Sequence, residues 1–179
     1  GYVGLPAVLR FGEVGFRVLG FDIDSDKVKQ INAGESYIRH LPADRVASLV
    51  GSGRFEATTD FARLREADAI LICVPTPLTR HRNPDLQYVV RTADAIAHTL
   101  RAGQLICLES TTYPGTTEEL LQPRFEATGL RVGLDFFLVF SPEREDTGNT
   151  HFGLATIPKV LGGVSGACGE LGETLYRTI

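Results

Sequence analysis

Two glycines at the start of the chain and one aspartate about twenty residues later have the spacing of a dinucleotide-binding site. Gly1-Tyr2-Val3-Gly4 has the form of the tail of a Gly-rich turn. In such a turn Gly1 lets the backbone approach a pyrophosphate, and the first amides of the next helix face its charge. Asp22 ends the apolar run from Arg17 to Phe21, where a carboxylate accepts hydrogen bonds from the adenosine ribose and repels a 2′-phosphate. We therefore expect NAD, and not NADP, as the cofactor.

Each of these features also has a simpler interpretation. Two closely spaced glycines occur in ordinary surface turns, and Asp22 could cap a helix that begins near Ser25. Lys27, one helical turn beyond Asp24, could reach the ribose or a phosphate, but it could equally be a solvated surface lysine. The agreement of spacing and position favours the cofactor site.

Three polar or proline-rich segments follow later apolar runs. Residues 73–77 contain two prolines that end a strand and turn the chain across the strand ends, or serve only to stop the strand. Residues 109–115 supply hydroxyls that can orient a water or the reacting group, although Thr116 or Thr117 could act as a helix cap. Residues 141–146 supply carboxylates for general-base chemistry and an arginine for an anionic substrate, or form a self-paired surface charge run.

Short apolar runs alternate with helical stretches, which is typical of buried parallel strands joined by crossover helices. Strands are predicted at Arg17 to Asp22, Ala69 to Val74, Gln104 to Glu109 and Asp135 to Phe140, with weaker candidates at Arg54 to Thr58 and Lys159 to Gly162. Helices are predicted to begin near Leu5, Ser25, Asp44, Asp60, Asp85, Thr116 and Ser165. The fold class is therefore α/β, a doubly wound parallel sheet of Rossmann type, with the strands' carboxyl ends at one ligand-binding edge. Because no strand precedes the glycine turn, we expect the first strand to be missing from the chain.

The composition excludes several classes of protein. The chain has 179 residues, of which 43% are hydrophobic and 22% charged, as in a globular α/β domain with a tail. No apolar run approaches the roughly 18 residues of a membrane span. A net charge of −4 with scattered Lys and Arg argues against nucleic acid and anionic membranes as partners. No signal peptide is recognisable and the cysteines lack paired metal spacing, so we expect a cytoplasmic protein without a metal site.

Seven ordered segments resemble the UDP-glucose and GDP-mannose dehydrogenase family and cover nearly the whole chain: GYVGLP, FDIDSDKVKQIN, ESYIRH, ADAILICVPTP, ESTTYPGTT, SPERED and IPKVLGG. ESTTYPGTT and SPERED are most similar to the branch that acts on UDP-N-acetylglucosamine or UDP-N-acetylmannosamine. The resemblance implies that residues 1–179 are an NAD-binding Rossmann-like domain, truncated at both ends. It also implies a central domain that forms a homodimer and a C-terminal domain for the UDP-sugar, both absent from this chain.

The same resemblance implies a reaction and a set of site residues. NAD takes hydride from the sugar C6 alcohol, a cysteine holds the aldehyde as a thiohemiacetal, and a second NAD oxidises it to a thioester that water hydrolyses. By position, Gly1, Tyr2 and Val3 line the pyrophosphate, Asp22 and Lys27 the ribose, and Val74, Pro75, Thr76 and Thr111 the rest of the cofactor. Thr111 positions a catalytic water, Glu143 acts in thioester hydrolysis or supports the sugar pocket, and Arg144 binds substrate beside it.

The chain departs from the family pattern at two places. The UDP-glucose branch has a second glutamate where this chain has Thr147, which puts a two-carboxylate scheme in doubt. The family's nucleophilic cysteine is followed by Pro, Lys and Asp, and no such segment is present; Cys168 resembles it only superficially. We expect Cys168 to be buried or half-buried with no catalytic role, and Cys107, inside a strand, to be inert. Cys73 could lie near the nicotinamide, but as a strand-end cysteine without a neighbouring base it is expected to be structural. The four histidines lack partners at metal-ligand spacing and are expected at the surface.

Two rival functions remain open on sequence grounds. A nucleotide-sensing or regulatory Rossmann module would need no nucleophile, and a β-hydroxyacid dehydrogenase would share the fold. The segment Ser141-Pro142-Glu143-Arg144 argues against the hydroxyacid enzyme, which has no evident use for it.

Overall fold

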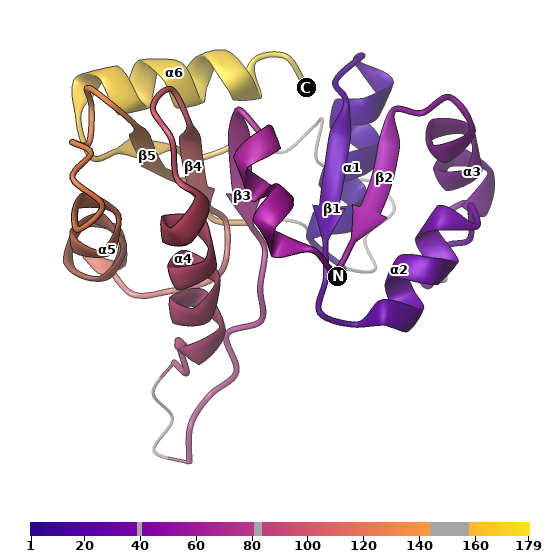
Figure 1. The fold of residues 1–179 in the computed structure, drawn as a ribbon, viewed down its shortest axis with the longest axis horizontal. Helices are drawn as coiled ribbons and strands as arrows, with labels where there is room; N and C mark the ends of the chain where they lie inside the picture. Colours follow the sequence, from indigo (N-terminus) through magenta and orange to yellow (C-terminus); the bar gives the residue numbers. More distant parts are fainter. Residues whose placement is uncertain (39–40, 81–83, 144–157) are drawn as a thin grey trace. The chain divides into compact units, whose positions relative to one another are not determined.

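A computed structural model describes residues 1–38, 41–80, 84–143 and 158–179 of the chain (Figure 1). These residues form two units, one made of residues 1–61 with 178–179 and the other of residues 62–177. Each unit has a sheet of mainly parallel strands covered by helices, and each is described by itself.

The first unit is built on two parallel strands, β1 (Val18–Phe21) and β2 (Phe55–Thr58), with Val18 in register with Phe55. Three helices pack on them: α1 (Gly4–Glu13), α2 (Ser25–Asn32) and α3 (Ala43–Gly51). The apolar faces of these elements meet in one core, which contains Leu5, Leu9, Ile31, Ile38, Leu41, Val46, Leu49, Phe55 and Ala57. Burial of these side chains supplies the main driving force for folding of the unit.

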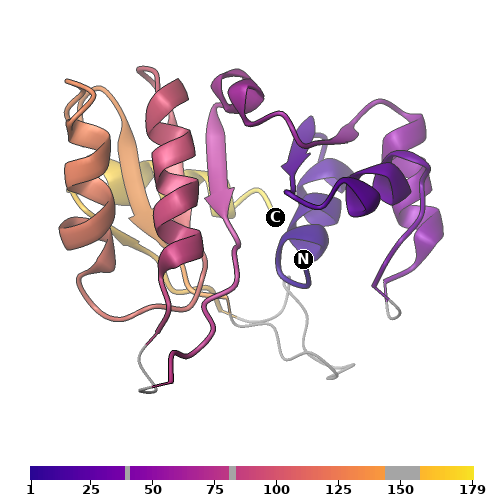
Figure 2. The same ribbon diagram turned by 60° about the horizontal axis from the view of Figure 1, so that its bottom comes forward.

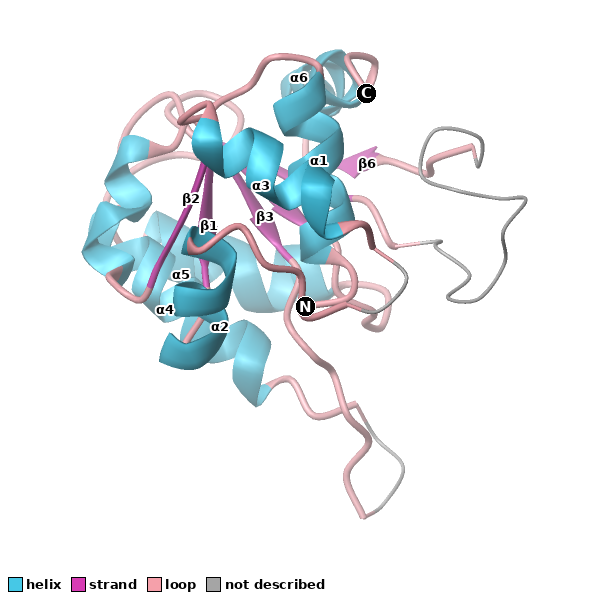
Figure 3. Ribbon diagram, turned by 90° about the vertical axis from the view of Figure 1, so that its right-hand side faces the viewer, coloured by secondary structure: helices cyan, strands magenta, loops and turns pink. Residues whose placement is uncertain are grey.

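The second unit is a four-stranded sheet in the order β3-β4-β5-β6. Strands β3 (Ala69–Ile72), β4 (Leu105–Leu108) and β5 (Phe137–Phe140) are parallel. The short edge strand β6 (Gly162–Gly163), labelled in Figure 3, is antiparallel to β5. All four residues of β4 are buried, because it lies between two neighbouring strands and is covered on both faces.

Helices cover both faces of this sheet. Helices α4 (Gln87–Thr99) and α5 (Gln122–Glu126) lie on one face and α6 (Gly166–Tyr176) on the other (Figures 1 and 2). A π-helical turn, η2 (Thr116–Leu121), leads into α5, and a 3₁₀ helix, η1 (Phe61–Glu66), precedes β3. Two-sided coverage is typical of a parallel sheet.

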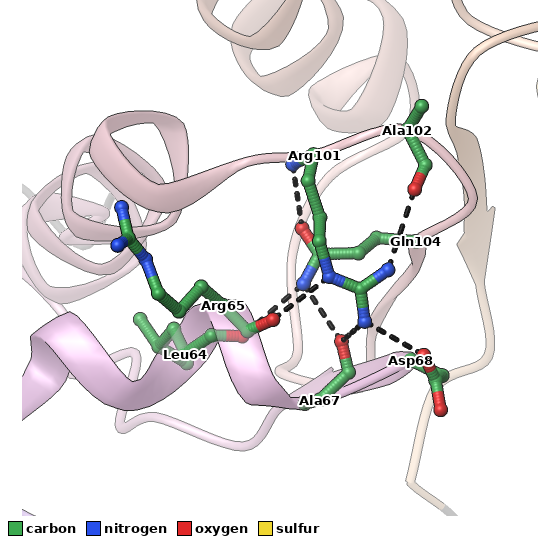
Figure 4. Close-up of polar contacts among 7 residues, drawn as sticks. All are labelled: Leu64, Arg65, Ala67, Asp68, Arg101, Ala102 and Gln104. Atoms are coloured by element: carbon green, nitrogen blue, oxygen red, sulfur yellow. Dashed lines mark hydrogen bonds and ion pairs between the residues drawn. The ribbon is translucent and has the colours of Figure 1, made fainter.

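A cluster of hydrogen-bonded polar groups lies at the end of the sheet where β3 and β4 begin (Figure 4). Gln104 is fully buried; its Nε2 donates to the carbonyls of Leu64 at 3.1 Å and Ala67 at 2.7 Å, and its Oε1 accepts from the amide of Arg101 at 3.0 Å. The Arg101 guanidinium donates to the Asp68 carboxylate at 2.6 Å and again to the Ala67 carbonyl at 3.1 Å. These bonds satisfy backbone groups that burial would otherwise leave without partners.

Two glycines allow unusually close packing. A Cβ atom on Gly163 would lie 2.2 Å from the backbone nitrogen of Gly169, so β6 and the first turn of α6 meet backbone to backbone. A Cβ atom on Gly12 in α1 would lie 2.7 Å from a terminal methyl group of Leu49 in α3. Any side chain at either position would force a displacement.

The predicted strands and helices are all present, with three differences. The segment after Asp60 is a 3₁₀ helix and the segment after Thr116 begins as a π-helix, because hydrogen-bond spacing is not visible in residue patterns. Strand β6 overlaps the predicted segment Lys159 to Gly162 only at Gly162, and it is antiparallel, so its carboxyl end does not join the edge formed by β3, β4 and β5, contrary to the expectation for all strands. Among the described residues, no helix has the length and hydropathy needed to cross a bilayer.

Candidate functional site

The glycine turn at the start of the chain leads directly into α1. The first turn of α1 contains no acidic side chain, and the first amides of any helix lack intrahelical acceptors and carry partial positive charge. A Cβ atom on Gly1 would meet no atom of the described residues within 4 Å, so packing among these residues gives no reason for glycine there. A ligand that approaches the backbone closely would give that reason. Gly1 and Tyr2 are exposed, as this role requires, and Val3 is half-buried at the N-cap position.

Asp22 lies directly after β1, at the carboxyl end of that strand. Its Oδ1 accepts from the amide of Asp24 at 3.0 Å, and its backbone amide donates to the Thr58 carbonyl at 3.2 Å. Its other carboxylate oxygen accepts no hydrogen bond from the residues that the structure describes. The simpler interpretation of Asp22 as the cap of α2 is wrong, since the cap is Asp24, which accepts from the amides of Asp26 and Lys27. Those two amide bonds, that of Lys27 first, lower the pKa of Asp24.

Lys27 lies in the first turn of α2 and is half-exposed. Its Nζ is 3.5 Å from Oδ2 of Asp24 and 5.9 Å from the centre of the Tyr37 ring. The Tyr37 hydroxyl accepts a hydrogen bond from the backbone nitrogen of Gly1 at 2.9 Å. Burial raises the pKa of Tyr37 to about 12, with further contributions from the charges of Asp22 and Asp24. Tyr37 therefore stays a neutral phenol beside the glycine turn.

Two residues of this region were not predicted from sequence. Tyr37 joins the glycine turn to Lys27, although it lies in a different segment of the chain. Ile23, directly after Asp22, is 82% exposed. An isoleucine so exposed suits contact with a flat apolar group of a ligand. The sequence signal that could have identified Ile23 is its position directly after the strand-end carboxylate of Asp22.

In the second unit, the segment after β3 is fixed by a hydroxyl from the segment after β4. Ser110 is buried, and its Oγ accepts from the amide of Val74 at 2.9 Å and lies 2.8 Å from the Val74 carbonyl. The same Oγ lies 3.2 Å from the carbonyl of Ile72, the last residue of β3. Val74, Pro75 and Thr76 therefore cross the carboxyl edge of the sheet beside Thr111, which is exposed.

The segment after β5 reaches the same edge. The amide of Ser141 donates to the Leu108 carbonyl at 3.0 Å, and the amide of Glu143 donates to the Glu109 carbonyl at 3.2 Å. The Ser141 hydroxyl donates to the Val160 carbonyl at 2.9 Å. Glu143 is half-buried. The carboxyl ends of β3, β4 and β5 thus bring Val74, Thr111 and Glu143 to one edge of one unit, as predicted.

The threonines after Thr111 do not cap a helix, contrary to the alternative considered above. The N-cap of η2 is Gly115, in a left-handed conformation with φ of 96°, and no side chain caps that end. Thr116 Oγ1 instead donates to the Tyr113 carbonyl at 2.9 Å and lies 2.6 Å from Thr112 Oγ1. These bonds stiffen the turn that follows Thr111.

Glu109, directly after β4, is the most buried acidic or basic side chain among the described residues of the second unit, and sequence reasoning did not select it. It is 1% exposed; its Oε1 is 3.0 Å from Nζ of Lys159 and accepts a hydrogen bond from the Tyr176 hydroxyl, and its Oε2 accepts from the Cys73 thiol at 3.4 Å. The expectation that Cys73 lacks a neighbouring base is therefore wrong, because Glu109 is close in space though distant in sequence. Burial, followed by the charge of Glu109, raises the pKa of Cys73 well above its usual value, so this thiol is not a nucleophile.

The remaining cysteines are buried, as expected. Cys107 lies in β4, where burial raises its pKa to about 12. Cys168 lies in the first turn of α6 and its sulfur accepts from the amide of Leu138 at 3.3 Å. His98 is exposed on α4. Arg144, predicted to bind substrate, and Thr147, His40, His81 and His151 lie outside the described residues. Among the described residues, no group of three or more His, Cys, Asp or Glu side chains could hold a metal ion.

Residues 1–179 match the sequence profile of the UDP-glucose/GDP-mannose dehydrogenase family, NAD binding domain. The chain belongs to this family. Its relatives include UDP-N-acetyl-D-mannosamine dehydrogenase of Pyrococcus horikoshii, 36% identical over 99% of this chain, and UDP-N-acetyl-D-glucosamine 6-dehydrogenase of Pseudomonas aeruginosa, 35% identical over 100%. The chain spans 43% and 42%, respectively, of the length of these relatives.

Solved structures of the family agree with the fold. The structure of the P. horikoshii UDP-N-acetylmannosamine dehydrogenase matches with a TM-score of 0.93 at 36% identity, over 99% of this chain and 43% of that one. A ternary complex of GDP-mannose dehydrogenase from P. aeruginosa matches with a TM-score of 0.88 at 30% identity, over 100% of this chain and 43% of that one. The predicted family, Rossmann-like fold class and NAD cofactor are therefore confirmed, and the chain is the NAD-binding domain of a member of this family.

Proposed function

We propose that the protein containing this chain oxidises the C6 alcohol of a UDP-N-acetylhexosamine to the carboxylate in two NAD-dependent steps, and that residues 1–179 are its NAD-binding domain. The observation that carries this proposal is the convergence of Val74, Thr111 and Glu143 at the carboxyl ends of β3, β4 and β5. The relatives named for UDP-N-acetylmannosamine and UDP-N-acetylglucosamine favour an acetylated hexosamine as the sugar.

The first unit binds the adenosine and pyrophosphate end of the cofactor. Gly1, Tyr2 and Val3 present backbone and the positive end of α1 to the pyrophosphate. Asp22 accepts from the adenosine ribose hydroxyls, and its charge disfavours the 2′-phosphate of NADP. Lys27 reaches the ribose or a phosphate from the first turn of α2. Among the described residues, the space around Gly1 is open and the second Asp22 carboxylate oxygen accepts no hydrogen bond, and both features support the assignment to NAD.

The second unit serves the reacting end. NAD, when bound, accepts a hydride from the sugar carbon in each step. Val74, Pro75 and Thr76 form the wall against which the cofactor rests, and the exposed Thr111 hydroxyl donates to or accepts from a water beside it. Glu143 accepts a proton from that water as it attacks the oxidised carbon, and Arg144 pairs with an anionic group of the substrate. Oxidation of one alcohol to one carboxylate with water releases two reduced cofactors and three protons.

The parts of the relatives that lie beyond this chain would supply the nucleophilic cysteine, the main UDP-sugar contacts and a homodimer interface. Nucleic acid and membranes are not partners in this proposal, because the net charge is −4 and the Lys and Arg residues are scattered along the sequence. Three free thiols suit a reducing compartment such as the cytoplasm.

The test uses the full-length protein with NAD and, separately, UDP-N-acetylglucosamine, UDP-N-acetylmannosamine, UDP-glucose and GDP-mannose. We expect NADH to form with an acetylated UDP-hexosamine in a ratio of two per sugar consumed, with a carboxylate product identified by mass spectrometry. NADH formation from β-hydroxyacids alone, or tight NAD binding without turnover on any nucleotide sugar, would replace the proposal with one of its two rivals.

A further inference from the structure

The Glu109 carboxylate forms the centre of a buried polar cluster in the second unit. It receives a charged donor from Lys159 at 3.0 Å, a hydroxyl donor from Tyr176 and a thiol donor from Cys73 at 3.4 Å. The Lys159 Nζ also lies 4.7 Å from the centre of the Tyr176 ring. The Lys159 and Glu109 side chains are 19% and 1% exposed, respectively, so this ion pair is shielded from solvent and salt.

The tyrosine and thiol donors in this cluster stay protonated. Burial raises the pKa of Tyr176 far above its ordinary range, and the neighbouring Cys107 and Glu109 raise it further. Burial and the Glu109 charge raise the pKa of Cys73 in the same direction. The Glu109 carboxylate therefore has one cationic and two neutral donors, which is the satisfied arrangement that a buried charge requires.

The cluster is tied by backbone bonds to both candidate catalytic segments. Glu109 directly precedes Ser110 and Thr111, and its carbonyl accepts from the amide of Glu143 at 3.2 Å. Lys159 directly precedes Val160, whose carbonyl accepts from the Ser141 hydroxyl at 2.9 Å. The ion pair thus connects the segment that carries Thr111 to the segment that carries Glu143.

We propose that Glu109 and Lys159 are positioning residues, whose buried ion pair fixes residues 110–111 and 141–143 in the geometry that the reaction needs. Nothing in the arrangement requires either side chain to touch substrate. A displacement of about 1 Å in a catalytic group can slow a reaction about a hundredfold, so a rigid support for Thr111 and Glu143 has a large effect on rate. The effect on rate rests on the function proposed above, whereas the effect on the two segments does not.

The first test measures amide hydrogen exchange in the full-length protein and is independent of catalysis. Lys159→Met should speed exchange of the hydrogen-bonded Ser110 and Glu143 amides at least about tenfold, while the amides within β3 and β4 keep their wild-type rates. Arg177→Met is the matched control, because it breaks an exposed ion pair with Glu173 on α6 and should leave these rates unchanged. Unaltered exchange in Lys159→Met would overturn the proposal.

The second test separates positioning from plain stability. Lys159→Met leaves the buried Glu109 carboxylate without its cation, which is destabilising. The double variant Glu109→Gln/Lys159→Met removes that buried charge as well. We expect the double variant to regain thermal stability but to keep kcat about 10- to 100-fold below wild type, with the dissociation constant of NAD nearly unchanged. Lys159→Arg should recover part of kcat. A double variant that regains wild-type stability and wild-type kcat together would show that the pair is only structural.

The two proposals can fail separately. If Lys159→Met shows faster exchange but the wild-type protein turns over no nucleotide sugar, the positioning role is supported and the proposed function is rejected. If the wild-type protein turns over a nucleotide sugar but Lys159→Met leaves exchange unaltered, the proposed function is supported and the positioning role is rejected.

Discussion

Replacing Asp22 tests the cofactor assignment at a single side chain whose two oxygens have different roles. Oδ1 accepts from the Asp24 amide at 3.0 Å and so holds the start of α2, whereas the other oxygen, which accepts no bond from the described residues, is the one that the proposed function assigns to the adenosine ribose. Asp22→Ala removes both roles. Asp22→Asn keeps an acceptor for the Asp24 amide but removes the charge, so the pair of variants separates cofactor binding from local folding.

The expected magnitude follows from the bond that is lost. A hydrogen bond to a charged group contributes about 1.5 to 3 kcal/mol. At about 1.4 kcal/mol per tenfold change, Asp22→Ala should weaken NAD binding by about 10- to 150-fold. Binding of NADP should not weaken, because the change also removes a carboxylate that repels the 2′-phosphate. The preference for NAD over NADP should therefore collapse, with Asp22→Asn between wild type and Asp22→Ala.

Titration calorimetry of the full-length protein with each cofactor measures these constants. Asp26→Asn is the matched control, since Asp26 is an exposed carboxylate on α2 whose side chain pairs only with Lys29 among the described residues. Equal wild-type affinity for NAD and NADP, or unchanged NAD affinity in Asp22→Ala, would refute the role given to Asp22.

Three further predictions concern the second unit. Glu143→Gln should slow turnover by about 10² to 10⁴ with NAD affinity nearly intact and should let an acyl-enzyme adduct accumulate, visible by intact-protein mass spectrometry; loss of NAD binding would instead make Glu143 a cofactor residue. Gln104→Met, which keeps the shape but removes three hydrogen bonds, should lower the opening free energy of β3 and β4 by about 2 to 4 kcal/mol in hydrogen exchange, whereas exposed Gln30→Met should change it little. The pKa of Cys107 is raised in the folded state from 9.0 to about 12, so its contribution to stability is complete below pH 9 and is lost as the pH rises towards 12. Urea unfolding should show this loss, and an equally steep loss in Cys107→Ala would assign it to another group.

The positions of the strands and helices along the chain were largely predictable from the sequence. The runs that became β1, β3, β4 and β5 are short, apolar and followed by polar or proline-containing segments, so both the strands and their ligand-facing ends can be located without coordinates. Val74, Thr111 and Glu143 were placed at one edge for the same reason. Asp22 was considered as the cap of α2, whereas the cap is Asp24, two residues later; residue types alone do not resolve an offset of this size.

The buried cluster could not be predicted in this way. Lys159 is 50 residues from Glu109 and Tyr176 is 67 residues away, so no local period or motif connects them. Their meeting depends on β6 adding to the sheet in the antiparallel direction and on α6 covering the face above β4. Glu109 was visible in sequence only as an acidic residue at the end of an apolar strand, where burial makes a partner obligatory.

The contact between Gly163 and Gly169 bears on which sequences can evolve from this one. At Gly12, the atoms that obstruct a Cβ are the methyl groups of Leu49, so a shorter side chain at position 49 could act as a second-site suppressor of Gly12→Ala. At Gly163, the obstructing atoms are the backbone of Gly169 and the carbonyl of Ser165, which every amino acid possesses. No single compensating substitution exists there. Position 163 should therefore remain glycine through any divergence that keeps α6 docked, while position 12 can drift together with position 49.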